Sequence, residues 1–576
     1  MSSEDAQAWS KIQKVQLNNQ TRVLDENTHA RVTNKLKDNK LITQYYDDVH
    51  TLYDGFMRGV RVSGEKPCLG YRPDSTSPYK WLTYNEVKRR STDFGAGLVN
   101  LCGCQASPDQ FLGVYAKNMV EWVIAEKGSM FYGMCLVPMY NTLGDQAMRW
   151  ICEQTEMEIM VIENGQCLKD FKRDVLDHDE GKFIKKIILI TPTDSDTNLI
   201  EEVQKTGVQV FGFQEVETYG KNHPLDHVPP KPDDTAVINY TSGTTGNPKG
   251  VMLTHRNFVA DAAGAMYMLP RPFTGDDVWY SYLPLPHVFE RTAQVCLMKV
   301  GACIGFFSGD IRAMPDDLKN LKPTIFGGVP RVWTRFYDKI KNAGAGSWIK
   351  GMLVNMALKS KIKEVEKGVC RNDSIWDKIV FKKVQALLGG RVTMAITGAA
   401  PISPEILNTL RAAFGAHMVE GYGQTECAAA CSATLPGDHT GTVGCPLVCN
   451  EIRLEDVPDM KYFAKDGKGE ICIRGDNVMK GYFRDEAKTA ETIDAEGWLH
   501  TGDIGMWCEQ GNLKIIDRKK NIFKLAQGEY IAPEKIENIY IRSSAAMQVF
   551  LHGDSLQAFL LVFVVQTLIK KLLFED

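Results

Sequence analysis

Eleven residues from Tyr240 to Gly250 combine hydroxyls, glycines and a lysine at a density that suits phosphate binding. Their sequence is Tyr-Thr-Ser-Gly-Thr-Thr-Gly-Asn-Pro-Lys-Gly. The glycines would let backbone N–H groups approach an anion, the Ser and Thr hydroxyls add donors, and Lys249 adds positive charge. The stretch is not a Walker loop, because no Gly-Lys-Ser/Thr follows at the required spacing. A mobile Gly/Thr turn is the alternative, and the density of donors favours phosphate binding over it.

Two short apolar runs must position this loop. Ala236 to Tyr240 precedes it and Val251 to Thr254 follows it, and both runs are typical of buried strands. The pattern therefore predicts a flexible, hairpin-like loop held between two strands.

A second polar stretch, Glu420 to Glu426, has the sequence Glu-Gly-Tyr-Gly-Gln-Thr-Glu and follows another strand-like run. Its glycines would let a planar ring approach the backbone, and Tyr422 could stack on that ring. Glu426 is a carboxylate suited to holding Mg²⁺ against phosphate oxygens. By itself such a heptapeptide is more often a polar turn with a surface glutamate.

Three weaker signals complete the set of chemically interesting residues. Asp503, after the turn His500-Thr-Gly, could accept hydrogen bonds from ribose hydroxyls, although a solvated turn is the commoner case. His287 lies between prolines and apolar residues, where a structural histidine is commoner than a catalyst. Four cysteines have C-x3-C spacing that superficially resembles a zinc site, but four buried thiols are the favoured interpretation; they are Cys427, Cys431, Cys445 and Cys449.

Length and composition limit the class of protein. The chain has 576 residues, 44% hydrophobic and 24% charged, which predicts a globular protein of two or more domains. A net charge of −4 without a basic stripe gives no case for nucleic acid. The 15 scattered cysteines suit a reducing compartment, and no apolar leader segment is found. The longest apolar run, Ala558 to Val565, is too short to span a bilayer and predicts a buried strand.

Alternating strand-like and helix-like segments predict an α/β fold. Strands are expected at Phe111 to Ala116, Cys135 to Met139 and Lys186 to Ile190, and a second series begins at Val278. From Glu451 onward, short strands between Gly-rich turns indicate a small β-barrel. The predicted organisation is an arm (1–50), a large domain of two layered α/β sheets plus the barrel (51–516), a charged linker (517–521) and a partial α+β domain (522–576).

The ordered set of motifs resembles the adenylate-forming superfamily, and most closely the long-chain fatty acyl-CoA synthetases. The resemblance covers residues from about 50 to 565. It is carried by Tyr240 to Gly250, Leu283 to Arg291, Gly305 to Phe307 with Gly309 to Arg312, Thr397 to Pro401, Glu420 to Glu426, Gly497 to Asp503, and Ile515 to Glu537.

The resemblance implies a two-step reaction. A fatty carboxylate attacks the α-phosphorus of ATP to give acyl-adenylate and pyrophosphate, and the thiol of CoA then displaces AMP. His287, Lys249 and Glu426 are the implied catalytic residues, with Thr244 and Glu426 holding Mg²⁺. Gly528 and Tyr530 would approach CoA. The implied ATP-binding residues are Thr241, Ser242, Gly243, Thr244, Thr245, Gly246, Lys249, Gly398, Ala399, Gly421, Tyr422, Gly423, Gln424, Thr425, Asp503, Arg518, Lys520 and Lys524.

Further roles follow from the same resemblance. Lys520 would be the hinge about which the small domain turns between the half-reactions, and His287 would lie where fatty acid and phosphate meet. An apolar tunnel would set acyl chain length, with Phe306, Phe307, Val329 and the Trp333 region as candidates. The expected partners are a long-chain fatty acid, ATP and CoA. The expected location is the cytoplasm, with peripheral association with endoplasmic reticulum or mitochondrial membrane as an alternative.

The sequence departs from the family at both ends. The final segment, Gln566 to Asp576, does not match, so the lysine that the family carries near its own C-terminus has no counterpart. The N-terminal membrane segment of many animal members has none either. These departures predict a truncated form, and the alternative function is a non-catalytic relative that binds ATP or fatty acid. A third alternative is an adenylating enzyme for another acid.

Overall fold

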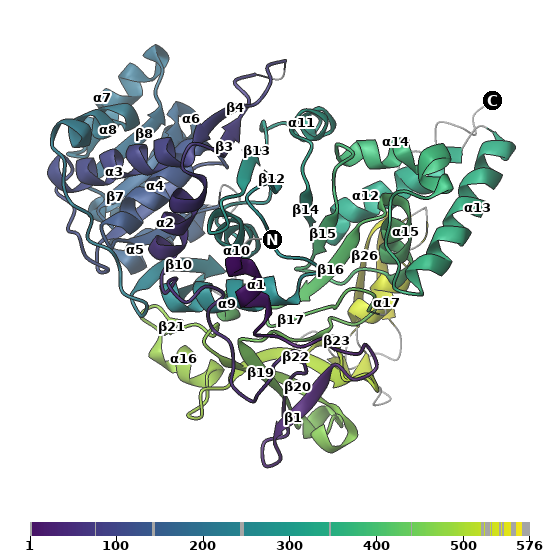
Figure 1. Cartoon of the computed structure of the whole chain (residues 1–576). Helices are drawn as coiled ribbons and strands as arrows, with labels where there is room; N and C mark the ends of the chain where they lie inside the picture. Colours follow the sequence, from purple (N-terminus) through teal and green to yellow (C-terminus); the bar gives the residue numbers. More distant parts are fainter. Residues whose placement is uncertain are drawn as a thin grey trace.

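The computed structural model describes residues 3–74, 76–140, 145–241, 247–344, 347–438, 441–519, 523–524, 530–531, 533–540, 543, 546–553 and 560–566. Within them the chain builds two large mixed sheets, one smaller antiparallel sheet and two short hairpins. Figure 1 shows the first sheet, with β7 and β8, on the left, the second sheet extending from β12 and β13 in the middle to β15 and β16 on the right, and the antiparallel sheet below them.

The first large sheet has eight strands in the order β21-β11-β10-β6-β5-β7-β8-β9. Its inner strands pair in parallel, and β10 and β11 form the antiparallel hairpin predicted around the glycine-rich loop. The strands are β5 (Phe111–Tyr115), β6 (Cys135–Pro138), β7 (Ile159–Asn164), β8 (Lys186–Thr191), β9 (Gln209–Gly212), β10 (Thr235–Thr241), β11 (Lys249–Thr254) and β21 (Gly481–Tyr482).

The second large sheet has nine strands in the order β18-β17-β16-β15-β14-β12-β13-β3-β4. The run from β16 to β3 is parallel throughout. The strands are β3 (Pro67–Tyr71), β4 (Lys80–Thr83), β12 (Val278–Ser281), β13 (Cys303–Phe306), β14 (Ile325–Gly328), β15 (Met394–Thr397), β16 (His417–Tyr422), β17 (Ser432–Ala433) and β18 (Cys445–Pro446).

Successive strand residues point to opposite faces of a sheet. Both faces of the two large sheets carry apolar side chains, and helices cover both faces. Leu112 and Val114 pack into a central core, whereas Tyr115 packs into an outer one. The central core lies between the sheets and contains α2 (Leu52–Ser63), α3 (Tyr84–Asn100), α4 (Val120–Phe131), α8 (Phe213–Asn222), α9 (His255–Met268) and α10 (Val288–Met298). The outer faces carry α5 (Asp145–Thr155), α6 (Gly165–Phe171) and α7 (Thr197–Lys205) on one side, and α11 (Met314–Leu321), α12 (Pro330–Lys341), α13 (Trp348–Val365), α14 (Lys382–Gln385) and α15 (Pro404–Phe414) on the other.

The predicted small barrel is instead a six-stranded sheet in the order β1-β2-β19-β20-β22-β23. A barrel would need its end strands β1 and β23 to pair, and among the described residues they form no ladder. The N-terminal arm, which carries little sequence signal, supplies β1 and β2 and thereby adds an edge to the sheet. The elements are α1 (Ser3–Trp9), β1 (Thr21–Asp25), β2 (Ala30–Thr33), β19 (Asn450–Glu455), β20 (Lys468–Gly475), α16 (Glu486–Thr492), β22 (Leu499–Trp507) and β23 (Leu513–Arg518).

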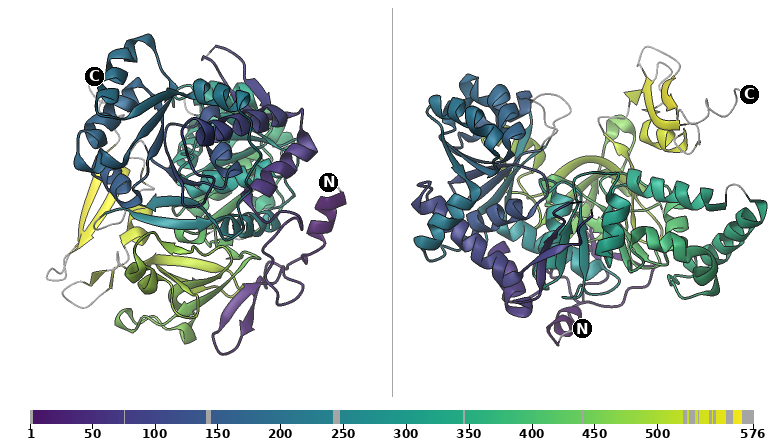
Figure 2. Two further views of the ribbon diagram at one scale, coloured as in Figure 1. Left: turned by 90° about the vertical axis from the view of Figure 1, so that its left-hand side faces the viewer. Right: turned by 90° about the horizontal axis from the view of Figure 1, so that it is seen from above.

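The last described elements are two small hairpins and one helix. They are β24 (Phe523–Lys524) with β25 (Tyr530–Ile531), α17 (Pro533–Tyr540), and β26 (Ala546–Gly553) with β27 (Leu560–Gln566). Figure 2 shows α17 and the second hairpin at the edge of the molecule. The burial predicted for the apolar strand is wrong: Leu561 to Val565 are 38–56% exposed. Two strands and one helix provide too little surface to bury both faces of β27.

Candidate active site

One cavity of about 810 Å³ opens where the three sheets meet. Its wall combines the β10–β11 hairpin, α9 and α10, the turns after β15 and β16, α16, and the inner strands of the six-stranded sheet. Pockets of about 300–1,000 Å³ accommodate small ligands, so this cavity is large enough for a nucleotide and part of a second substrate. The turns after β15 and β16 lie at carboxyl ends of parallel strands, where α/β proteins bind ligands.

The phosphate loop brings Thr241 and Lys249 to the cavity wall. These residues face each other across the β10–β11 hairpin and both line the cavity. The Lys249 ammonium lies 5.3 Å from the centre of the Tyr482 ring, and the Tyr482 hydroxyl donates to Glu426 Oε1 at 2.8 Å. Lysine, tyrosine and glutamate therefore form one connected group. The intervening predicted residues, Ser242, Gly243, Thr244, Thr245 and Gly246, lie outside the described residues.

The turns after β15 and β16 supply most of the predicted nucleotide-binding residues. Ala399 adopts a left-handed backbone with φ of 68°, a conformation that costs a non-glycine residue energy and is concentrated at functional sites. The predicted residues of these turns that line the cavity are Gly398, Ala399, Gly421, Gly423, Gln424, Thr425 and Glu426.

Tyr422 supports the cavity from behind, because it does not itself line it. Its hydroxyl donates to Asp503 Oδ2 at 2.7 Å, and Arg518 Nε lies 3.4 Å from Asp503 Oδ1. Asp503 is only 7% exposed, yet it lines the cavity together with Arg518. Burial and the neighbouring Asp503 raise the pKa of Tyr422, which stays a neutral donor. The predicted stacking of Tyr422 on the base stays a prediction.

Gly423 is a position that no larger residue can occupy without movement of the backbone. A methyl group built there would lie 2.2 Å from the carbonyl oxygen of Ala429, whereas one at Gly421 would have no neighbour closer than 3.9 Å. We expect Gly423→Ala to destabilise the protein by about 1–3 kcal/mol and to weaken AMP binding. Gly421→Ala is the matched control, and its thermal midpoint should equal that of the native protein. Equal thermal midpoints for the two variants would show that the turn adapts freely.

His287 joins the polar and apolar parts of the wall. It is the N-cap of α10, and its Nδ1 accepts the N–H of Phe289 at 3.2 Å. Burial lowers the pKa of His287, so the ring is neutral near pH 7 and its proton sits on Nε2. The side chain lines the cavity as a hydrogen-bond donor.

The apolar part of the wall comes from α9, the segment that follows it, α10 and one residue of β15. The tunnel candidates Phe306, Phe307, Val329 and Trp333 do not line this cavity, and Phe306 and Trp333 are buried in two different cores. The apolar lining instead consists of Ala265, Leu269, Phe273, Val288, Phe289, Ala293, Cys296 and Ile396.

One ionisable residue, Asp261, lies in this apolar part. It is fully buried in α9, lines the cavity and accepts the N–H of Ala430 at 3.1 Å. Burial raises the pKa of Asp261 to about 8, against about 3.9 in an unfolded chain. The folded state therefore keeps a proton between about pH 4 and 8 that the unfolded state has lost. The contribution of Asp261 to the free energy of unfolding should therefore fall as pH rises through this window, by up to about 1.4 kcal/mol per pH unit.

Asp261→Asn should flatten this pH dependence, since the amide keeps an acceptor for Ala430 and does not ionise. We expect the thermal midpoint to fall less between pH 5 and 8 in the variant than in the native protein. Buried Glu290 and Glu420, whose pKa values burial raises to about 7 and about 8, contribute in the same direction and remain in the variant. Asp310→Asn on the surface is the control and should keep the native slope. An unchanged slope in Asp261→Asn would contradict the assignment.

Several cavity residues escaped the sequence-based prediction. Lys488, Glu491 and Thr492 come from α16, and Glu470 and Lys519 form an ion pair of 3.1 Å at the wall. Lys488, Glu491 and Thr492 lie in none of the motifs, so no local signal marks them, whereas Lys519 lies in the charged linker without being predicted as a site residue. The basic groups of the wall are Lys249, Lys488, Arg518 and Lys519, and the acidic groups are Asp261, Glu426, Glu470, Glu491 and Asp503.

A few predicted residues are not placed. Lys520 and Gly528 lie outside the described residues, and the side chains of Lys524 and Tyr530 are not described either. The four cysteines considered as a zinc site are buried free thiols, as the favoured interpretation holds; they are Cys427, Cys431, Cys445 and Cys449.

Comparison with known protein families gives an AMP-binding family, in agreement with a cavity large enough for a nucleotide. The family model described as AMP-binding enzyme matches residues 56–483. The mouse protein named Long-chain-fatty-acid–CoA ligase 5 is 50% identical over 534 residues, covering 92% of this chain and 77% of the relative. The human Long-chain-fatty-acid–CoA ligase 1 is 48% identical over 541 residues, covering 93% and 76%.

Solved structures share the fold at much lower identity. The adenylation domain of a carboxylate reductase from Mycobacterium chelonae superposes with a TM-score of 0.72 at 23% identity, covering 90% of this chain and 79% of that one. The A domain of the carboxylic acid reductase from Segniliparus rugosus, in complex with AMP and a co-purified carboxylic acid, has a TM-score of 0.71 at 23% identity, covering 90% and 82%. These likenesses establish the α/β fold.

Proposed function

This chain belongs to the AMP-binding enzymes and, within them, to the long-chain-fatty-acid–CoA ligases, and we propose that it activates long-chain fatty acids. In the first half-reaction the fatty carboxylate attacks the α-phosphorus of ATP, forming acyl-adenylate and releasing pyrophosphate. In the second the thiol of CoA attacks the acyl carbon and AMP leaves. The products are acyl-CoA, AMP and pyrophosphate.

The cavity residues meet the electrostatic demand of the first step. A carboxylate and a polyphosphate repel each other, so the site must hold them in line and offset their charge. Lys249 of the phosphate loop and Lys488 of α16 both line the cavity and supply positive charge. Glu426 offers the oxygen donor that Mg²⁺ prefers, and bound there Mg²⁺ would neutralise phosphate charge. Thr244, the other proposed ligand, lies outside the described residues.

The same wall orients the two substrates. Asp503 and Arg518 would hold the ribose, with Tyr422 fixing the carboxylate of Asp503 from behind. The acyl chain would lie along α9 and α10, where apolar side chains exclude water. His287, as a neutral donor at the N-terminus of α10, would hydrogen-bond an oxygen of the carboxylate or phosphate where the two regions join.

The observation that carries this proposal is one cavity with a polar nucleotide wall and an apolar α9–α10 wall. The test is a panel of fatty acids of increasing length, assayed separately for ATP–pyrophosphate exchange and for thioester formation. We expect exchange that depends on the fatty acid and is strongest with long chains. ATP binding without exchange at any chain length would contradict the ligase and favour a non-catalytic relative. Exchange confined to another class of acid would contradict the long-chain assignment.

We also propose that the protein attaches peripherally to the cytoplasmic face of a membrane, and the support comes from α13. No helix among the described residues is long and apolar enough to cross a bilayer. The outer face of α13, however, carries an apolar ridge of Trp348, Ile349, Met352 and Met356, which are 77, 52, 47 and 48% exposed. Fifteen free cysteines are in keeping with a reducing compartment.

The ridge has the character of an interfacial helix. At about 100° per residue, Trp348, Met352 and Met356 share one face, and Lys359 and Lys363 continue that face toward the C-terminus. The opposite face is buried, with Lys361 tied to Asp377 at 2.8 Å. Tryptophan and aliphatic side chains next to lysines favour the surface of an anionic bilayer. Figure 1 shows α13 at the outer edge of the molecule, where a flat surface can reach it.

Vesicle flotation tests this attachment. We expect the whole chain to float with phosphatidylserine vesicles and less with phosphatidylcholine vesicles. The double variant Trp348→Ser/Met352→Ser should lose flotation, and Lys359→Glu should weaken it only with the anionic lipid. Val228→Ser, at an apolar position 45% exposed elsewhere, is the control and should float like the native chain. Native flotation by the double variant would contradict a role for α13.

A further inference from the structure

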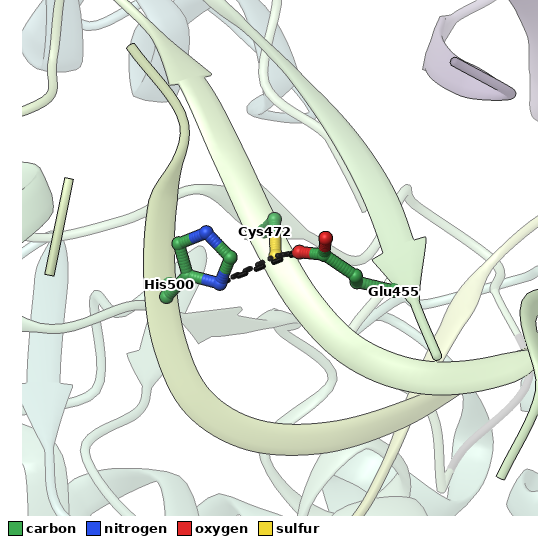
Figure 3. A group of neighbouring side chains, drawn as sticks. All are labelled: Glu455, Cys472 and His500. Carbon is green, nitrogen blue, oxygen red and sulfur yellow. Dashed lines mark hydrogen bonds and ion pairs between the residues drawn. The ribbon is translucent and has the colours of Figure 1, made fainter. Parts of the chain in front are cut away.

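Three metal-binding side chains meet on the six-stranded sheet, outside the set that the proposed reaction uses. Glu455 ends β19, Cys472 lies in β20 and His500 lies in β22, and these three strands are neighbours. Cys472 and His500 are register partners across β20 and β22. Figure 3 shows the carboxylate and the imidazole converging on the sulfur from either side.

The separations of the three donor atoms have the dimensions of a metal site. Cys472 Sγ lies 3.4 Å from Glu455 Oε2 and 3.6 Å from His500 Nδ1, and Glu455 Oε2 lies 3.4 Å from His500 Nδ1. Tetrahedral zinc, with bonds of about 2.3 Å to sulfur and about 2.0–2.2 Å to nitrogen and oxygen, places such donors about 3.3–3.6 Å apart. We propose that Glu455, Cys472 and His500 bind a zinc-class divalent cation.

The second ring nitrogen of His500 faces a carboxylate, as metal-binding histidines usually require. Asp494 Oδ2 lies 3.6 Å from His500 Nε2. Asp494 is itself fixed by the backbone N–H groups of Glu496 and Trp498, each at 2.9 Å. It therefore favours the tautomer with the proton on Nε2, which leaves Nδ1 free for the metal.

The local charge also favours a cation. Arg453 is the guanidinium shared by three carboxylates: it lies 3.1 Å from Asp494, 3.4 Å from Glu496 and 3.8 Å from Glu455. One positive charge does not offset three negative ones, so a divalent ion gains from their field.

Binding would take the following course. The metal forms bonds to Glu455 Oε2, Cys472 Sγ and His500 Nδ1, and a water completes the tetrahedron. The thiol proton of Cys472 is released to solvent, and no redox change occurs. Burial raises the pKa of this thiol in the metal-free protein, and coordination reverses that effect because the thiolate is the ligand.

The site adjoins the nucleotide cavity. His500 lines the cavity and lies three residues before Asp503 on β22. Bound metal would tie β22 to β19 and β20 at this point, so the ion should stabilise the wall that holds the ribose.

Cobalt substitution tests the ligand set, since tetrahedral cobalt bound by thiolate gives a charge-transfer band in the near ultraviolet and intense visible bands. We expect these bands when Co²⁺ is added to the whole untagged chain, and their displacement by Zn²⁺. Cys472→Ser should abolish the charge-transfer band, whereas Cys508→Ser, the control among the 15 cysteines, should keep it. Absence of the bands, or their survival in Cys472→Ser, would overturn the proposal.

Zinc calorimetry gives a second measurement, which does not require the substitution of a buried residue. The Glu455 side chain is 43% exposed, so Glu455→Gln should fold normally and lose the high-affinity site. Asp494→Asn leaves the three ligands in place and should weaken zinc binding by about 10–100-fold. Zinc should raise the thermal midpoint of the native chain and not that of Glu455→Gln. Equal affinity and equal thermal shift in native chain and variants would mean adventitious binding elsewhere and would overturn the assignment.

Discussion

Replacing Glu426 by glutamine is expected to slow adenylate formation by about 100- to 1,000-fold while leaving the fold intact. A charge-stabilising group in an active site commonly contributes about 3–4 kcal/mol to the transition state, which corresponds to that range. The amide has nearly the same shape as the carboxylate but carries no charge, so it would not hold Mg²⁺ against the phosphates. The second half-reaction, in which no pyrophosphate leaves, should be affected much less.

The surroundings of Glu426 explain why its geometry is fixed. The Tyr482 hydroxyl donates to Glu426 Oε1 at 2.8 Å, and the same ring lies beneath the Lys249 ammonium at 5.3 Å. The backbone carbonyl of Glu426 accepts the N–H of Met479 at 2.9 Å. One tyrosine therefore aligns Glu426 and Lys249 at the wall of the cavity.

Tyr482→Phe separates the charge of Glu426 from its position, and Glu486→Gln is the control. Tyr482→Phe removes the hydrogen bond but keeps the ring under Lys249, so we expect a loss of about tenfold or less in pyrophosphate exchange. Glu486→Gln, on the exposed first turn of α16, should behave like the native chain. The decisive measurement is pyrophosphate exchange compared with thioester formation from supplied acyl-adenylate. Equal losses in both assays for Glu426→Gln would contradict a role confined to adenylation.

The phosphate loop and its flanking strands could be predicted because their signals are local. Apolar runs on both sides of Tyr240 to Gly250 define β10 and β11, and the hairpin register follows from them. The turns after β15 and β16 were found for the same reason, since each follows an apolar strand directly.

Residues that reach the site through long-range pairing could not be predicted. Tyr482 arrives because β21 pairs with β11, through the register partners Val251 and Tyr482, which are far apart in the sequence. Lys488 and Glu491 then follow on α16. The tunnel candidate Phe306 does not line this cavity for a related reason: the alternation of strand β13 turns its side chain into the central core. The sequence alone does not show which face of a strand lines the cavity.

The largest loss of stability is expected at Asp317, which is fully buried in α11. Its carboxylate accepts from Arg72 Nη1 at 2.7 Å, from the Tyr280 hydroxyl at 3.0 Å and from the N–H of Ser308 at 3.0 Å. These donors follow or belong to β3, β12 and β13, so one side chain joins α11 to three neighbouring strands at one end of the second sheet.

Asp317→Ala should lower the free energy of unfolding by about 3–5 kcal/mol, because it leaves a buried guanidinium and two further donors without this acceptor. Arg72, whose side chain is 1% exposed, keeps its contact with Asp316 at 2.8 Å. That contact should limit the loss, so a value near the lower end of the range is expected. Urea unfolding followed by tryptophan fluorescence and by circular dichroism measures the difference.

A surface pair in the adjoining loop provides the control. Asp310 and Arg312 form an ion pair whose side chains are 47% and 88% exposed, so Asp310→Asn should leave stability unchanged. If Asp317 acts through its charge on Arg72, Arg72→Met in the Asp317→Ala background should restore part of the stability, since it removes the uncompensated cation. If the double variant is less stable than Asp317→Ala, the loss arises mainly from Tyr280 and Ser308. The carboxylate would then act chiefly as a hydrogen-bond acceptor between strands rather than as a counter-ion.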